Sequence, residues 1–162
     1  MNIIEDIGNY LIKNNLKLAT TESCTGGLLS SKLTDISGSS NYTALNLVTY
    51  SNETKEKMLG VVLNEEGAVS ENCAFQMAKG LHKLTNADIC ISTTGIAGPT
   101  GGTETKPVGL MYSCIYTPQR HKIYKIVVDS SLNRIKIKEA FVTKVLVNLH
   151  DFLNINHTDE II

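Results

Sequence analysis

Helical spacing of hydrophobic positions recurs along the chain. Ile3, Ile7 and Leu11 share one face of a helix and predict a helical segment over about the first fourteen residues. The same spacing, together with turn signals, predicts four more helices, over residues 25–34, 52–59, 71–84 and 133–153. Ser51 and Ser70 each stand directly before one of these segments, where a hydroxyl can cap the first helical turn.

Short apolar runs between these helices predict strands. Three of them cover residues 17–21, 45–50 and 87–93, and we expect the strand at 45–50 to be buried. Two more, at residues 108–117 and 122–129, flank the turn sequence PQRH and predict a hairpin. Helices and strands alternate first and a hairpin follows, which predicts an α/β fold with a mixed sheet covered by helices on both faces.

The length and composition fit one compact domain. The chain has 162 residues, of which 42% are hydrophobic, and this is enough to bury a core without covalent cross-links. We expect the domain to cover residues 1–153 and residues 154–162 to form a loose tail. The four cysteines form no CxxC pair, so a disulfide framework and a zinc site are poorly supported, and we expect buried thiols.

Charge and hydropathy argue against several classes of partner. Lys and Arg number 15 against 16 Asp and Glu, so the chain lacks the basic footprint of a nucleic-acid-binding protein. No window approaches the roughly 18 apolar residues of a membrane span. The N-terminus also lacks the charged and then apolar form of a signal peptide. We therefore expect a cytoplasmic protein that binds neither nucleic acid nor membrane.

The sequence TESCTGG, residues 21–27, lies at a predicted strand-to-helix turn and places three nucleophile-type side chains in a row. Such a turn can present the hydroxyl of Ser23 above a sheet, with backbone N–H groups near Thr25 to Gly27 facing an oxyanion. The same residues also fit a phosphate-binding loop, or an ordinary helix start in which Ser23 is the N-cap. A catalytic serine therefore requires a base elsewhere in the chain.

Histidines and one lysine are the candidate bases. None of the four histidines belongs to a recognisable motif, which weakens a Ser-His-Asp triad and a Cys24-His pair, and each histidine is interpreted as a solvated or capping side chain. Ser-Lys pairs are an alternative in which a neutral amine accepts the hydroxyl proton. Lys55 is the lysine in question, although its segment NETKEK is by itself typical of a solvated helix face.

Residues 94–109, TGIAGPTGGTETKPVG, predict a long loop rich in glycine. Successive N–H groups of such a loop can form an anion-binding nest. The loop contains neither GxxxxGK[ST] nor GxGxxG, so sites for ATP and dinucleotides lose their usual support. A flexible crossing between strands fits the pattern equally well.

Several unusual segments occur in the order typical of one family. The segments TTESCTGGLLSSKLTDISGSS, VTYSNETKEKMLGV, GAVSE and TTGIAGPTGGTETKPVG resemble the nicotinamide-nucleotide amidase family, also known as the C-terminal domain of CinA proteins. The resemblance spans roughly residues 5 to 153. It implies a single three-layer α/β/α sandwich with a mixed sheet, no metal or organic cofactor, and a homodimer or higher homo-oligomer. Larger CinA proteins carry a further N-terminal domain, so a chain that begins at the first helix is expected to be a stand-alone deamidase.

The resemblance also implies an activity and assigns residues to it. Members of the family hydrolyse the carboxamide of nicotinamide mononucleotide to nicotinic acid mononucleotide and ammonia by a Ser-Lys mechanism. Ser23 corresponds to the nucleophile and Lys55 to the base, and Tyr50 is a candidate for orienting that pair or the substrate. Further contacts to the substrate are expected from Thr25, Gly26, Gly27, Thr94, Gly95 and Gly98. Lys106 and Arg134 are the candidates for binding the phosphate.

The segment before the last helix departs from the family pattern. Family members commonly carry Gly-Asp-Arg there, whereas this chain reads SLNR, which keeps Arg134 and changes the two residues before it. Lys138 stands one turn later, where family members often carry arginine. The difference concerns the binding of phosphate rather than the chemical step.

Two other functions remain as alternatives. The CinA name is tied to competence and DNA damage, so one alternative is a non-catalytic nucleotide-binding or scaffold domain, which the presence of both Ser23 and Lys55 does not favour. The second is an amidase that acts on another small pyridine or nucleotide amide.

Overall fold

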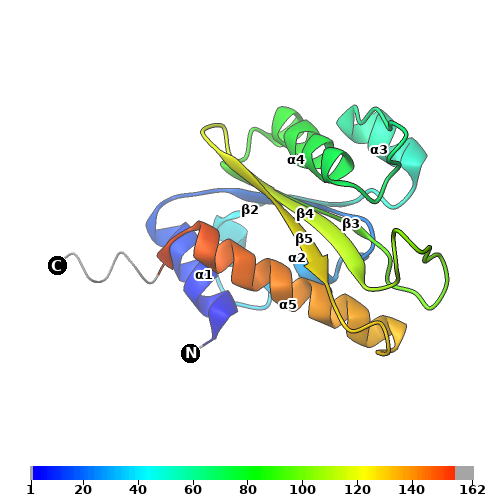
Figure 1. Ribbon diagram of the computed structural model, residues 1–162. Helices are drawn as coiled ribbons and strands as arrows, with labels where there is room; N and C mark the ends of the chain where they lie inside the picture. Colours follow the sequence, from blue (N-terminus) through cyan, green and yellow to red (C-terminus); the bar gives the residue numbers. More distant parts are fainter. Residues whose placement is uncertain (1, 156–162) are drawn as a thin grey trace.

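Five strands form one mixed sheet in the order β2-β1-β3-β4-β5 in the computed structural model, which describes residues 2–155 (Figure 1). The strands are β1 (Leu18–Glu22), β2 (Thr43–Val48), β3 (Ile89–Gly95), β4 (Leu110–Tyr116) and β5 (His121–Val127). β1 pairs in parallel with β2 and with β3, whereas β4 runs antiparallel to β3 and to β5. The predicted mixed sheet with a hairpin is therefore confirmed. Of the predicted tail, residues 156–162 lie outside the described residues.

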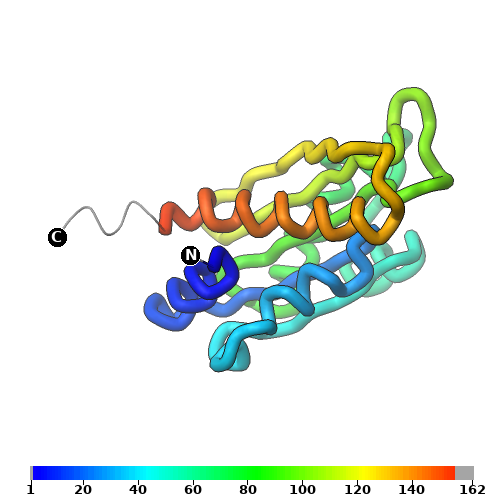
Figure 2. The backbone as a smooth tube through the Cα atoms, turned by 90° about the horizontal axis from the view of Figure 1, so that it is seen from below, coloured from blue at the N-terminus to red at the C-terminus, as the bar shows by residue number. Residues whose placement is uncertain are grey.

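Helices cover both faces of this sheet, which gives the expected three-layer α/β/α arrangement (Figures 1 and 2). One face carries α1 (Ile3–Lys13), α2 (Leu28–Leu33) and α5 (Arg134–Phe152), and the other carries α3 (Asn52–Leu59) and α4 (Glu71–Thr85). A short 3-10 turn, η1 (Ser39–Asn41), precedes β2. The larger hydrophobic core lies under α1, α2 and α5, and a smaller one lies under α3 and α4.

The strand β2 differs from its prediction. The apolar run at residues 45–50 predicts a buried strand, but β2 stands at the edge of the sheet, and Val48 at its end is 50% exposed. This prediction is wrong because a short apolar run reports hydrophobicity and not the position of a strand within its sheet. The central strands β1 and β3, by contrast, are buried on both faces.

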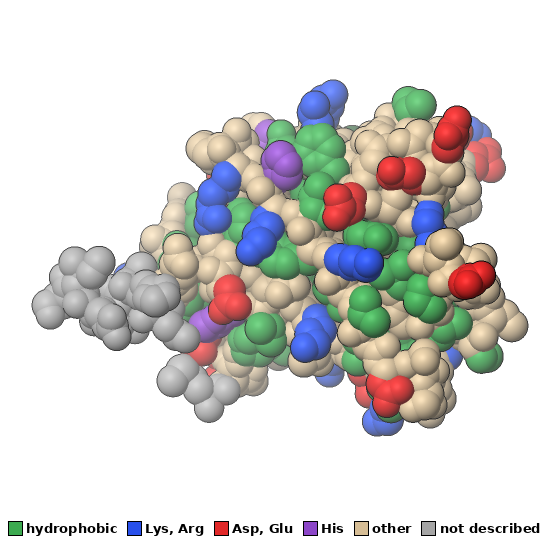
Figure 3. All heavy atoms as spheres, in the orientation of Figure 1, with side chains coloured by type: hydrophobic (Ala, Val, Ile, Leu, Met, Phe, Trp, Pro, Cys, Tyr) green, Lys and Arg blue, Asp and Glu red, His purple; other side chains and the backbone are tan. Residues whose placement is uncertain are grey.

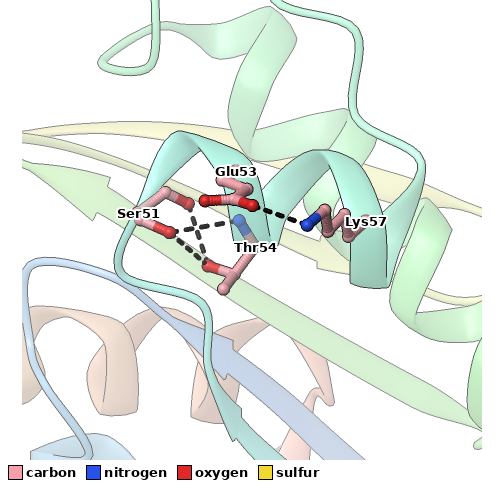
Figure 4. Close-up of polar contacts among 4 residues, drawn as sticks. All are labelled: Ser51, Glu53, Thr54 and Lys57. Atoms are coloured by element: carbon pink, nitrogen blue, oxygen red, sulfur yellow. Dashed lines mark hydrogen bonds and ion pairs between the residues drawn. The ribbon is translucent and has the colours of Figure 1, made fainter.

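The helix α3 begins and ends where its capping residues predict, and Figure 4 shows the contacts at its start. The hydroxyl of Ser51 accepts a hydrogen bond from the backbone N–H of Thr54 at 3.1 Å, and Gly60 ends the helix in the left-handed conformation. Glu53 and Lys57 form an ion pair of 2.5 Å on the outer side. The caps set the bounds of α3, and its buried side carries Lys55 and Leu59.

α4 approaches the end of α3 closely at Gly80. A methyl group at this position would stand 2.0 Å from the carbonyl oxygen of Leu59. We expect Gly80→Ala to lower the free energy of unfolding by about 1–2 kcal/mol. Forcing the helices apart costs about 2–3 kcal/mol, and alanine recovers only about 1 kcal/mol through its higher helix propensity. Urea unfolding measures the change.

The exposed Lys83 provides a control on the same helix. Lys83→Ala should stay within about 0.5 kcal/mol of the parent protein. If Gly80→Ala is as stable as this control, the close contact with Leu59 does not hold α3 in place.

Candidate active site

The carboxyl ends of β1, β2 and β3 meet at one edge of the sheet. β1 leads to β2 through α2 on one face, and β2 leads to β3 through α3 and α4 on the other face. The first connection leaves the carboxyl end of β1 and the second leaves that of the neighbouring strand β2, so they diverge between these two strands. Open α/β sheets bind their ligands at such a switch point. Residues 23–27, 49–51 and 96–109 follow these strands, so the TESCTGG turn, the start of α3 and the glycine-rich loop gather at this edge.

Ser23 and Lys55, 32 positions apart in the sequence, are in direct contact at this edge. Lys55 Nζ lies 3.1 Å from Ser23 Oγ, and it also donates to the carbonyl oxygens of Thr49 at 2.8 Å and Tyr50 at 2.9 Å. Lys55 is 1% exposed and Ser23 is 9% exposed. The interpretation of NETKEK as a solvated helix face therefore holds for Lys57 but not for Lys55.

Burial disfavours the charged form of Lys55. Removal of the amine from water lowers the pKa of Lys55 below its ordinary value of 10.5, although the nearby thiols of Cys73 and Cys24 act in the opposite direction. None of the salt bridges within residues 2–155 includes Lys55. An amine in these surroundings can reach the neutral form that a general base requires.

Cys24 is the neighbouring candidate nucleophile. Burial raises the pKa of the Cys24 thiol to about 12, so the nucleophilic thiolate is scarce at neutral pH. As expected from the sequence, all four cysteines are free and buried. The geometry therefore favours Ser23, whose hydroxyl contacts an amine, over Cys24.

The TESCTGG turn is not an ordinary helix start. The N-cap of α2 is Gly27, whose φ of 101° lies in the left-handed region, and not Ser23. The N–H groups of Leu29 and Ser30 in the first turn donate instead to the buried carboxylate of Glu22. Sequence reasoning does not single out Glu22. The available signal is a carboxylate at the end of an otherwise uncharged strand, directly before the serine.

Arg134 bridges two segments at the rim of the site. Its guanidinium donates to the hydroxyl of Tyr50 at 2.9 Å and to the carbonyl oxygen of Gly98 at 2.6 Å. Tyr50 is 55% exposed, so it is not a buried strand residue. The start of α5, the glycine-rich loop and the segment after β2 are thus joined beside Ser23.

A cavity of about 330 Å³ adjoins the TESCTGG turn. It is lined by Thr25, Gly26, Gly27, Leu28, Ser31, Ile135, Lys138 and Glu139. Lys138 reaches over the turn, since its Nζ lies 3.4 Å from the position that a methyl group on Gly26 would occupy. Gly26 therefore leaves room for a cationic side chain beside the turn.

Three of the sequence candidates are engaged elsewhere. The hydroxyl of Thr25 is buried and donates to Glu22, and the hydroxyl of Thr94 donates to the carbonyl oxygen of Ala68 at 2.8 Å. Lys106 lines a separate cavity and donates to the backbone carbonyl of Glu66. The structure therefore brings Ser23, Lys55, Tyr50, Gly98 and Arg134 together, and it brings Lys138 to the turn in place of Lys106.

The histidines of the described chain have other contacts. His82 bonds to the carbonyl oxygen of Ala87, His121 packs against Phe75, and His150 lies 3.7 Å from a carboxylate oxygen of Asp6. His157 lies outside the described residues. The histidines with described contacts thus face other partners than Ser23.

Basic patches, metal-binding groups and membrane-spanning helices would each indicate another kind of ligand or partner. Positive and negative side chains are interspersed on the face shown in Figure 3, without a basic patch there. Within residues 2–155, no group of three His, Cys, Asp or Glu side chains is placed to hold a metal ion. None of the helices in this part of the chain is both long and apolar enough for a membrane span.

Together, the fold and the site define an α/β domain that holds a buried Ser-Lys pair at the switch point of its sheet. The family model of the CinA C-terminal domain matches residues 1–153, and the chain belongs to this family. A CinA-like protein from Thermotoga neapolitana is 43% identical over 154 residues, which cover 93% of this chain and 37% of that protein. The chain thus spans about a third of the length of the curated relatives it matches.

Solved structures of the same family share the fold. The crystal structure of a competence/damage inducible protein from Agrobacterium tumefaciens has a TM-score of 0.81 and 34% identity, and the match covers 96% of this chain and 97% of that chain. A CinA superfamily protein from Enterobacter cloacae has a TM-score of 0.87 and 29% identity, with 93% of this chain and 90% of that chain covered. The three-layer architecture is therefore that of CinA structures.

Proposed function

We propose that the protein hydrolyses the carboxamide of nicotinamide mononucleotide to nicotinic acid mononucleotide and ammonia, as its resemblance to the amidases of the family implies. The observation that carries this proposal is the contact between Lys55 Nζ and Ser23 Oγ at 3.1 Å. The carbonyl oxygens of Thr49 and Tyr50 each accept a hydrogen bond from the amine of Lys55, which occupies two of its hydrogens. In the neutral amine, the remaining position is a lone pair that faces the serine hydroxyl.

The chemistry proceeds through a covalent intermediate, because an amide is a poor acyl donor and an acyl-enzyme divides its hydrolysis into two easier steps. Ser23 Oγ forms a bond to the carboxamide carbon while Lys55 accepts the hydroxyl proton. The C–N bond then breaks, and Lys55 returns the proton to the departing ammonia. In the second step a water molecule gives a proton to Lys55 while its oxygen bonds to the ester carbon. The bond between that carbon and Ser23 Oγ then breaks, and Lys55 returns the proton to Oγ, which releases the acid and restores the serine hydroxyl.

The negative charge that develops on the carbonyl oxygen needs hydrogen-bond donors. The N–H of Gly26 already donates to the carbonyl oxygen of Ser23 at 3.1 Å. We therefore assign the oxyanion to the N–H groups of Thr25 and Gly27 on either side of it. The side chain of Thr25 takes no part, because its hydroxyl is directed to Glu22.

Two cations at the start of α5 suit the phosphate of the substrate. Arg134 stands at the rim and Lys138 lines the cavity beside the turn. A guanidinium can hold a phosphate through paired charge-assisted hydrogen bonds. In this arrangement the phosphate replaces the hydroxyl of Tyr50 as a partner of Arg134.

Removal of the Arg134 side chain should therefore weaken the binding of substrates that carry a phosphate. We expect Arg134→Ala to raise KM for nicotinamide mononucleotide by about 10- to 100-fold, because hydrogen bonds to charged groups contribute about 1.5–3 kcal/mol each. KM for the riboside, which has no phosphate, should change by less than about threefold. Initial rates of ammonia release measure both values.

Lys144→Ala is the matched control, since Lys144 is an exposed lysine further along the same helix. It should leave both KM values unchanged. Equal increases for the mononucleotide and the riboside in Arg134→Ala would remove Arg134 from the phosphate site.

A substrate panel tests the proposed function itself. Ammonia release is measured side by side from nicotinamide mononucleotide, nicotinamide, its riboside and NAD. The proposal requires the highest kcat/KM for the mononucleotide. Preference for another amide would favour the related-amidase alternative, and no release from any of them would favour the non-catalytic alternative. The homo-oligomeric state stays a prediction.

A further inference from the structure

The carboxylate of Glu22 is fully buried beneath the turn that carries Ser23. Its Oε1 accepts from the hydroxyl of Thr25 at 2.6 Å and from the N–H of Leu29 at 2.9 Å. Its Oε2 accepts from the N–H and the hydroxyl of Ser30 at 3.0 and 2.5 Å. The carboxylate is the acceptor in all four hydrogen bonds. It thereby links the end of β1 to the TESCTGG turn and to the first helical turn of α2.

The hydrogen bonds between Glu22 and Ser23 can be donated in one direction only. Thr25 uses its only hydroxyl hydrogen on Glu22, so the 2.9 Å contact between the hydroxyls of Thr25 and Thr93 must be donated by Thr93. The hydroxyl oxygen of Thr93 in turn accepts from the N–H of Ser23 at 3.3 Å, and this N–H also faces the carbonyl oxygen of Thr93 at 3.1 Å. A one-way chain of hydrogen bonds therefore runs from the backbone N–H of Ser23 through the hydroxyls of Thr93 and Thr25 to the carboxylate of Glu22.

We propose that Glu22 is a positioning residue for the nucleophile, an inference that rests on the proposed Ser-Lys hydrolase. The carboxylate anchors the chain of hydrogen bonds and holds Ser23 Oγ within reach of Lys55. Buried hydrogen-bond networks of this kind specify one arrangement when every member is satisfied. The same anchor holds the backbone of the turn, where we assign the oxyanion to the N–H groups of Thr25 and Gly27.

Glu22→Gln is the sharpest change, because it keeps the size of the side chain and replaces one acceptor by a donor. Whichever oxygen is replaced, the new amide group faces a backbone N–H, either that of Leu29 or that of Ser30. Neither N–H can turn away. The anchor is therefore broken on one side, while the substrate-facing residues keep their side chains.

The experiment compares Glu22→Gln and Thr93→Val with the control Ser92→Ala. Ser92 is equally buried on β3 but faces α4, where its hydroxyl donates to the carbonyl oxygen of Ala74 at 2.6 Å. Each variant is measured for thermal melting, for kcat and KM, and for the rate at which a fluorophosphonate labels Ser23. Labelling needs an activated serine but not the natural substrate.

We expect Glu22→Gln to lower kcat and the labelling rate by about 100-fold, as a displacement of about 1 Å can do, while KM changes less than about threefold. Thr93→Val should lower both rates by about tenfold, because the chain is cut while Glu22 keeps its partners. Ser92→Ala should lower only the melting temperature. If Glu22→Gln does not fold, kcat and the labelling rate of Thr93→Val test the proposal on their own.

Wild-type rates in folded Glu22→Gln, or in Thr93→Val, would overturn the proposal and leave Glu22 with a purely structural role. If the parent protein is labelled at Ser23 but releases no ammonia from the mononucleotide, the substrate assignment fails while Glu22 is still tested by labelling. If the parent protein is not labelled at Ser23 and does not turn over, both the proposed function and this inference fail.

Discussion

Ser23→Ala is expected to abolish amide hydrolysis, with kcat reduced by about 10⁴- to 10⁶-fold, which is the range found when a covalent nucleophile is removed. Cys24→Ala is expected to keep most of the activity. The two side chains are adjacent in the sequence, but Lys55 Nζ contacts the serine hydroxyl, and burial raises the pKa of the Cys24 thiol to about 12. Ammonia release at saturating nicotinamide mononucleotide measures both effects.

Binding distinguishes a lost nucleophile from a lost site. Calorimetry should show that Ser23→Ala binds nicotinic acid mononucleotide about as tightly as the parent protein does, because removal of one hydroxyl leaves the rim and the cavity intact. An active Ser23→Ala protein together with an inactive Cys24→Ala protein would contradict the assignment and make the thiol the nucleophile.

Lys55→Arg is expected to be inactive although it keeps a positive charge. A guanidinium stays protonated throughout the accessible pH range, so it cannot accept the proton of Ser23. We expect kcat to fall by about 10³-fold or more, comparable to the loss of other members of a catalytic unit. Lys57→Arg, on the exposed side of the same helix, is the control and should keep full activity. An active Lys55→Arg enzyme would leave Lys55 with an electrostatic or structural role.

The pH dependence follows from the same residue. The general base works as the neutral amine, so kcat should rise with pH through the pKa of Lys55 and level off above it. Because burial lowers that pKa, the rise should lie below the ordinary lysine value of 10.5. A profile that rises only at or above the ordinary value would show that Lys55 is solvated during turnover.

Local signals predict much of the fold. The bounds of α3 follow from Ser51 at its start and Gly60 at its end, and the hairpin of β4 and β5 follows from PQRH between two apolar runs. Both depend on residues within a few positions of one another. The burial of β2 depends on which strands lie beside it, and this is decided by residues far along the chain, so the prediction for residues 45–50 fails.

The site is predictable to a different degree. Ser23 and Lys55 can be paired from the resemblance to a family, but NETKEK alone does not distinguish a buried lysine from a solvated one. Glu22 escapes sequence reasoning because two of its donors are the backbone N–H groups of Leu29 and Ser30, and the residue types do not show where such groups point. Lys138 lines the cavity beside the TESCTGG turn, whereas Lys106 lines a separate cavity. Which lysine is near the turn depends on how the loop and α5 pack in the fold, and a local sequence pattern does not show this.

The most direct test of the Ser-Lys account is the partitioning of the acyl-enzyme between water and hydroxylamine. Hydroxylamine captures an acyl-serine as a hydroxamate, in competition with water that yields the acid. If nicotinamide mononucleotide and the methyl ester of nicotinic acid mononucleotide both acylate Ser23, they share one intermediate and must give the same ratio of hydroxamate to acid at a given hydroxylamine concentration. Ratios that depend on the leaving group, or no hydroxamate at all while acid forms at the full rate, would contradict a covalent intermediate on Ser23.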